Sequence, residues 1–133
     1  MTAAEPKYKE VHIVDDNDVD TYIAQHLLEE IGVASKISFS TNGAQALEYL
    51  KTLGNQQPDV IFLDIRMPIM GGFEFLEHYS KFLQGKTTCP VIYMLTSSSD
   101  PFDVDKAMAY PMVKKYFSKP LSRQIIFGII EAD

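Results

Sequence analysis

Residues 60–64, Val-Ile-Phe-Leu-Asp, form an unbroken apolar run that ends at an aspartate. Such a run is typical of a central strand of a parallel sheet, buried on both faces. Two other short apolar runs, residues 11–14 and 91–95, stop in the same way at Asp15 and at Thr96. The sequence therefore predicts a sheet whose strands end in polar side chains.

Between these runs the apolar spacing changes to that of helices. The helical stripes are Val19, Ile23, Leu27 and Ile31; Ala46, Leu47, Leu50 and Leu53; Phe73, Leu76, Tyr79 and Leu83; and Ile125, Ile126, Ile129 and Ile130. We expect a shorter helix at 102–109, a last helix at 121–130, a turn at Asn42-Gly43, and further strands at 36–40 and 115–117. Strand and helix alternate five times, which predicts an α/β fold, a doubly wound parallel sheet with helices on both faces.

The composition fits one small domain. The chain has 133 residues, of which 46% are hydrophobic and 23% charged. Residues 1–133 are therefore expected to form a single domain, with an ordered core at about 8–131, a free arm at residues 1–7, and no output domain after the last helix.

Charge and cysteine content exclude several classes of function. The net charge of −6 disfavours binding to nucleic acid. Cys89 is the only cysteine, which excludes an internal disulfide and a cysteine-rich zinc site. The chain has no apolar run of about 20 residues, and its first residues have no signal-peptide core. We therefore expect no membrane association and a cytoplasmic location.

Polar residues follow four of the expected strands. Asp15 and Asp16 follow the first strand, Asp64 the third, Thr96 the fourth and Lys119 the fifth. Ligands of open α/β sheets bind beyond the carboxyl ends of the strands, so these side chains are expected at one site.

The chemistry of this set favours phosphoryl transfer. Clustered carboxylates raise each other's pKa, and a divalent cation relieves that conflict. Oxygen ligands without His or Cys favour Mg²⁺ or Mn²⁺. An aspartate beside such an ion can attack phosphorus and form an acyl phosphate. Thr96 and Lys119 would then contact the phosphoryl oxygens.

Each residue alone also has a simpler interpretation. Asp15 and Asp16 could cap a helix, as could Thr96, and Lys119 could be a surface lysine. His12 is expected to be an ordinary strand residue, and His26 and His78 are expected on helix surfaces. Cys89 is expected to be an inert small residue. The Lys119-Pro120 bond could be cis, and the sequence leaves this open.

Four segments in this order resemble the response-regulator receiver domain of two-component signalling, the family of the chemotaxis response regulator. The segments are Val14-Asp15-Asp16, residues 61–72 (Ile-Phe-Leu-Asp-Ile-Arg-Met-Pro-Ile-Met-Gly-Gly), Leu95-Thr96-Ser97 and Phe117-Ser118-Lys119-Pro120. The resemblance covers essentially the whole chain. It implies a flavodoxin-like sheet in strand order 2-1-3-4-5 with five helices.

The resemblance also implies roles for individual residues. Asp64 would be the phosphoacceptor, and Thr96 and Lys119 would bind the phosphoryl group. Asp64, Asp16, Asp15 and the backbone carbonyl of Arg66 would hold Mg²⁺, with Asp16 as a direct ligand and Asp15 helping. Thr96 and Tyr116 would form the switch, although Tyr116 on a short strand could equally be packing. The protein would not be an enzyme beyond catalysing its own phosphorylation and dephosphorylation.

The implied partners are proteins. The donor would be a phosphohistidine of a sensor histidine kinase or of a histidine phosphotransfer protein. A downstream protein would bind residues 102–131, whose exposed part would include Lys106, Lys114, Lys115 and Tyr116, or the phosphoryl group would pass onward in a phosphorelay.

Two positions depart from the common family pattern. Arg66 and Ser98 stand two residues after Asp64 and Thr96, where the family tunes the lifetime of the phosphoryl group. We expect Arg66 to alter hydrolysis by crowding or pairing near the phosphate. Asp18 and Asp20 extend the acidic loop, and we assign them no ligand role.

Three alternative functions are weighed against this one. A metal-dependent phosphatase with an aspartyl nucleophile usually has a second Asp where this chain has Arg66. A flavin-binding protein needs a phosphate-cradling first loop, which the acidic residues 15–18 would oppose. A phosphorylation-independent interaction module would not need the complete set of acceptor-site residues that the chain has.

Overall fold

The structure is a computed structural model, and it describes residues 5–132. Five strands alternate with five helices along the chain. The order is β1 (Tyr8–Val14), α1 (Asp18–Ile31), β2 (Ala34–Ser40), α2 (Gly43–Thr52), β3 (Val60–Leu63), α3 (Gly72–Leu83), β4 (Val91–Thr96), α4 (Pro101–Met108), β5 (Val113–Ser118) and α5 (Arg123–Ala132). This alternation confirms the predicted α/β fold class.

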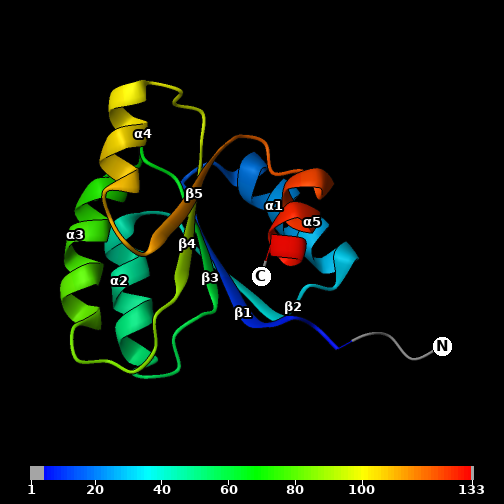
Figure 1. Cartoon of the computed structure of the whole chain (residues 1–133), viewed down its shortest axis with the longest axis horizontal. Coiled ribbons are helices and arrows are strands. Elements are labelled where there is room, and N and C mark those ends of the chain that lie inside the picture. Colours follow the sequence, from blue (N-terminus) through cyan, green and yellow to red (C-terminus); the bar gives the residue numbers. More distant parts are fainter. Residues whose placement is uncertain (1–4, 133) are drawn as a thin grey trace.

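The strands form one parallel sheet in the order β2-β1-β3-β4-β5. Helices α2, α3 and α4 cover one face, and α1 and α5 cover the other (Figure 1). This is the expected doubly wound arrangement with strand order 2-1-3-4-5. The three central strands, β1, β3 and β4, carry the apolar runs from which the fold was predicted.

The two faces of the sheet bury separate apolar clusters. Under α2 and α3 the largest fully buried side chains include Phe75 and Tyr79. Under α1 and α5 the cluster includes Leu28, Tyr93 and Ile126. All four residues of β3 are buried, since this strand contributes side chains to both clusters. The central position of β3 follows from its unbroken apolar sequence.

Local signals set the helix ends. The side chain of Asn17 accepts a hydrogen bond from the Asp20 amide and so caps α1. Gly32 ends α1 in the left-handed conformation, with φ of 75°. Asn42 caps α2 by accepting from the Gln45 amide. Asn42-Gly43 therefore begins a helix, where the sequence suggested a turn.

Three sequence expectations need correction. The stripe from Val19 is only part of the buried face of α1: Leu27 and Ile31 pack against the core, but Val19 is 66% exposed, and the fully buried positions are Ala24 and Leu28. Leu121 is buried but lies before α5, which begins two residues later. The free arm does not extend to residue 7, since Lys7 donates to the carbonyl of Ile130. Residues 1–4 of the expected arm lie outside the described residues.

Between residues 5 and 132, no helix combines the length and the apolar character needed to cross a membrane.

Candidate functional site

Four strands deliver polar residues to one edge of the sheet. Asp15 follows β1, Asp64 follows β3, Thr96 is the last residue of β4, and Lys119 follows β5. These strands are parallel, so their carboxyl ends meet at the same edge. Backbone hydrogen bonds continue past the strand ends, from the Asp64 amide to the Val14 carbonyl and from the Lys119 amide to the Thr96 carbonyl. The sheet therefore fixes the positions of these residues.

The ammonium group of Lys119 joins three carboxylates. Its Nζ lies 2.9 Å from Asp15 Oδ2, 2.9 Å from Asp20 Oδ2 and 3.0 Å from Asp64 Oδ2. Two of these partners were predicted site residues. Asp20 was not. It lies in the first turn of α1, and nothing in the sequence indicates that this turn lies close to Lys119 at the edge of the sheet.

The cluster is largely withdrawn from solvent. Asp15 is 5% exposed, Asp64 6% and Thr96 1%. Burial raises the pKa of Asp15, and the charge of Asp64 adds to that rise, while hydrogen bonds from Lys119 and from the Asn17 amide oppose it. Burial would lower the pKa of Lys119, but its hydrogen bonds to the three aspartates outweigh burial and raise that pKa. Lys119 is therefore a permanent cation of the site.

Asp16 completes a group of oxygen ligands. One carboxylate oxygen each from Asp15, Asp16 and Asp64 lies within 4.8 Å of the others. Asp15 and Asp64 are buried, and Asp16 is exposed. This set fits a hard divalent cation such as Mg²⁺, which takes one or two carboxylates and retains water on its open side.

The loop after β3 is held close to the site by glycine. A Cβ on Gly72 would lie 2.4 Å from the Asp64 carbonyl oxygen and 3.0 Å from the Ile65 Cα. The Gly72 amide donates to the Ile65 carbonyl, and the Ile65 amide donates to Asp64 Oδ1 at 2.8 Å. The absence of a side chain at Gly72 thus lets α3 begin directly against the strand that carries Asp64.

The remaining predicted residues lie on the α4 side of the site. Thr96 Oγ1 accepts a hydrogen bond from the Ser98 amide at 3.3 Å. The hydroxyl of half-buried Tyr116 donates to the Ser98 carbonyl at 2.8 Å. The side chain of Arg66 is 76% exposed and pairs with Asp103. The structure thus connects Tyr116 to Thr96 through Ser98, and it directs Arg66 toward α4.

The simpler interpretations of single residues do not describe this site. The cap of α1 is Asn17, and the cap of α4 is Asp100, so neither Asp15, Asp16 nor Thr96 caps these helices. Lys119 is not a surface lysine, since its side chain is 12% exposed. The Lys119-Pro120 peptide bond, which the sequence left open, is cis.

The arrangement of these residues at the sheet edge agrees with the family to which the sequence is similar. Residues 11–131 match the response regulator receiver domain family. The chain belongs to this family. As a receiver domain it is a module of two-component signalling, and the match begins within β1, ends within α5 and includes every element between them.

Individual relatives agree with the family assignment. The receiver domain is 31% identical over 123 residues to the probable methanogenesis regulatory protein FilR2 of Methanothrix harundinacea, covering 90% of this chain and 77% of the relative. It is 29% identical over 125 residues to the hybrid signal transduction histidine kinase K of Dictyostelium discoideum, covering 91% of this chain. The chain spans only 10% of that kinase, so the kinase's own activity does not transfer with the match.

The fold of the receiver domain is also found in solved structures. A two-component response regulator from Cytophaga hutchinsonii superposes with a TM-score of 0.86 at 27% identity, covering 95% of this chain and 96% of that one. The chemotaxis protein CheY4 of Vibrio cholerae superposes with a TM-score of 0.76 at 26% identity, covering 93% and 97%.

Proposed function

We propose that this receiver domain accepts a phosphoryl group on Asp64 and acts as a phosphorylation-controlled switch. The observation that carries the proposal is the ammonium group of Lys119 held between Asp15, Asp20 and Asp64 at the sheet edge. A partly buried cation beside a buried carboxylate is suited to neutralise the charge of a phosphoryl group added there. Membership of the receiver family supports the same function.

The proposed donor is a phosphohistidine of a sensor histidine kinase or of a histidine phosphotransfer protein. In the transfer, a carboxylate oxygen of Asp64 forms a bond to phosphorus, and the bond between phosphorus and the imidazole nitrogen of the donor breaks. The electron pair of that bond stays on the imidazole. Asp64 Oδ1 accepts from the Ile65 amide, which orients the carboxylate, while Lys119 contacts Oδ2.

Asp15, Asp16 and Asp64, together with the backbone carbonyl of Arg66, are the residues that would hold Mg²⁺. The ligand atoms are all oxygens, which such a cation prefers. Burial raises the pKa of Asp15, and a bound cation would counter this, because a nearby positive charge favours the ionised form of a carboxylate. When bound, the ion would neutralise charge that develops on the phosphoryl oxygens. The chain's own contribution is to orient the carboxylates and to keep Lys119 charged.

Thr96 and Tyr116 are the proposed switch residues. The Thr96 hydroxyl lies at the end of β4, where it could bind the phosphoryl group, and its present partner is the Ser98 amide. Ser98 in turn accepts the hydrogen bond of Tyr116. A movement of Thr96 toward Asp64 would therefore change the support of Tyr116 and shift the population of conformations on the α4–β5 surface.

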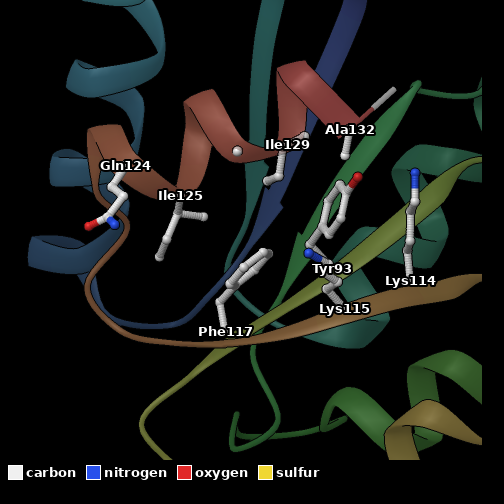
Figure 2. A pocket seen from close by; sticks show the side chains of 9 residues that line it. Tyr93, Lys114, Lys115, Phe117, Gln124, Ile125, Ile129 and Ala132 are labelled. Atoms are coloured by element: carbon white, nitrogen blue, oxygen red, sulfur yellow. The ribbon is translucent and has the colours of Figure 1, made fainter.

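The proposed output surface is formed by residues 102–131. Lys106, Lys114 and Lys115 are exposed on it. A cavity of about 260 Å³ lies between β5 and α5 within this region, with Phe117, Ile125 and Ile129 in its lining (Figure 2). A downstream protein would bind this surface, or the phosphoryl group would pass from Asp64 to the histidine of another phosphotransfer protein.

The test of the proposal is intact-mass spectrometry after incubation with acetyl phosphate and Mg²⁺. We expect a gain of one phosphoryl group, about 80 Da, that does not form when Mg²⁺ is chelated before acetyl phosphate is added. The Asp64→Asn variant should gain nothing. Asp105→Asn, which removes a carboxylate from the exposed side of α4, is the matched control and should gain the group as the wild type does.

Three other results would contradict the proposal. A phosphoryl gain that persists in Asp64→Asn would place the acceptor elsewhere. No gain in the wild type, together with no Mg²⁺-dependent binding of beryllofluoride, would favour a phosphorylation-independent interaction module. Sustained turnover of small phosphomonoesters would favour the phosphatase alternative.

A further inference from the structure

A single carboxylate on α4 contacts both loops that flank the acceptor site. Oδ2 of Asp103 accepts a hydrogen bond from the Ser98 hydroxyl at 2.7 Å and lies 3.7 Å from Nη2 of Arg66. The Asp103 side chain is only 14% exposed. Ser98 belongs to the loop after β4, and Arg66 belongs to the loop after β3. Asp103 therefore ties α4 to two loops that come from different strands.

These two loops lead directly to the acceptor site. Ser98 donates its amide hydrogen bond to Thr96 Oγ1, and its carbonyl accepts from Tyr116. Arg66 lies two residues after Asp64. A change at Asp103 would thus reach Thr96 through Ser98, and Asp64 through Arg66. We call Arg66, Ser98 and Asp103 the α4 clasp.

The charges of the α4 clasp set up a competition for Arg66. The guanidinium is 76% exposed and lies 3.7 Å from Asp103, so it can rotate away from this carboxylate at a cost similar to that of a surface ion pair, about 0.2–1 kcal/mol. A phosphoryl group on Asp64 would bring about −2 charge and acceptor oxygens that suit the forked guanidinium. Asp103 and the phosphoryl group would then compete for the same cation.

We propose that Asp103 is a positioning residue that sets the lifetime of the phosphoryl group by holding Arg66 on α4. This inference rests on the function proposed for Asp64. In the hydrolysis concerned, a water oxygen bonds to phosphorus, the bond between phosphorus and the Asp64 oxygen breaks, and the water protons pass to the phosphate and to solvent. With Arg66 held by Asp103, water reaches phosphorus; with Arg66 on the phosphoryl oxygens, its guanidinium stands in the path of the water.

The experiment compares loss of the phosphoryl group in matched variants. Asp103→Asn removes the charge that holds Arg66 and keeps an oxygen to accept from Ser98. Asp105→Asn makes the same charge change two residues along the same helix, at an exposed position. Each protein is phosphorylated with acetyl phosphate and Mg²⁺, the donor is removed, and the phosphorylated fraction is followed by intact mass.

We expect the phosphoryl group to last about threefold longer in Asp103→Asn than in the wild type, in keeping with the strength of an ion pair whose cation is exposed. Asp105→Asn should match the wild type. In the Arg66→Gln background, Asp103→Asn should have no further effect, because the cation it releases is absent. An unchanged lifetime in Asp103→Asn, or an effect that persists without Arg66, would overturn the proposal.

A second measurement examines the α4 clasp without phosphorylation. Amide hydrogen exchange of residues 97–100 should be faster in Asp103→Ala than in the wild type, nearly normal in Asp103→Asn, and normal in Asp105→Ala. Equal exchange in Asp103→Ala and the wild type would refute the clasp. If the wild type takes up no phosphoryl group, the proposed function of Asp64 fails, and with it the lifetime role; the exchange result then decides only whether Asp103 holds the loop.

Discussion

Lys119 illustrates how one residue organises this site. Its ammonium group is the shared partner of Asp15, Asp20 and Asp64. Carboxylates this close repel each other, and two of the three are buried. The cation therefore stabilises the folded chain as well as preparing the site for a phosphoryl group.

Replacing Lys119 by Met should lower the free energy of unfolding by about 3 kcal/mol, because it leaves buried carboxylates without their cation. Urea denaturation at pH 7 without divalent ions measures this. Lys115→Met, at an exposed position on β5, should change stability by less than about 0.5 kcal/mol. A loss in Lys119→Met no larger than that of the control would show that the three carboxylates do not depend on Lys119.

Two helical glycines, Gly72 and Gly128, differ in the space that surrounds them. A Cβ there would overlap the carbonyl oxygen of Asp64, whereas a Cβ on Gly128 in α5 meets no atom within 4 Å. Gly72→Ala should cost about 2–3 kcal/mol of unfolding free energy. Gly128→Ala should raise it by about 0.5–1 kcal/mol, since alanine is the better helix former. Urea unfolding of both variants checks this pair, and equal shifts would contradict it.

Strands β1 and β2 are joined by a buried polar network as well as by their backbones. The Ser38 hydroxyl donates to Glu10 Oε2, so it must accept from Nδ1–H of His12. In the neutral ring that burial favours, Nε2 of His12 is unprotonated and accepts from the Ser40 hydroxyl at 2.8 Å. His12 also stacks on Tyr49 of α2. The network joins the edge strand to β1 at one register, and burial keeps His12 neutral within it.

This network makes the stability of the sheet depend on pH. Burial, helped by the charge of Lys36, lowers the pKa of His12 from 6.5 to about 4. In the unfolded chain His12 takes up a proton near its ordinary pKa, so the unfolded state binds more protons and stability falls as pH drops from 6.5 toward 4. Between pH 7.5 and pH 5 this amounts to about 2 kcal/mol.

The measurement is urea denaturation of the wild type and of His12→Gln at both pH values. The variant is expected to be less stable at pH 7.5, but to lose about 2 kcal/mol less than the wild type on acidification. Comparing the two proteins cancels the contributions of other titrating groups. An identical loss in the two proteins would show that His12 is not the group responsible.

At the scale of the whole molecule, a cation bound at the sheet edge should stabilise the entire fold. A ligand that binds only the folded state raises the free energy of unfolding, by about 1.4 kcal/mol at ten times its dissociation constant. We expect MgCl₂ to raise the thermal midpoint of the wild type relative to EDTA. Asp16→Asn should abolish most of that rise while leaving stability in EDTA nearly unchanged, because Asp16 is exposed.

Na⁺ at matched ionic strength is the control for general screening of the net charge of −6. Calorimetry in MgCl₂ and in NaCl distinguishes the two effects. The same rise in both salts would mean that screening, not a site at Asp16, produces it.

The sheet of this molecule is encoded in local features of the sequence. The unbroken apolar run of β3 can be satisfied only where both faces of a sheet are covered, which made β3 central. The polar residues that interrupt the runs at Asp15, Asp64 and Thr96 marked the strand ends. For α1 the apolar spacing predicted only part of the buried face: Leu27 and Ile31 pack against the core, whereas Val19 faces solvent and Ala24 is buried.

The sequence by itself determined the fold class, the strand ends and most of the acidic site, because apolar periodicity and the residues that break it are local properties of the chain. Only the tertiary structure decided that Asp20 joins Lys119 and that Asp103 links Arg66 to Ser98. These contacts join residues on different elements. They depend on how α1 and α4 pack against the sheet edge, and no local pattern encodes that packing.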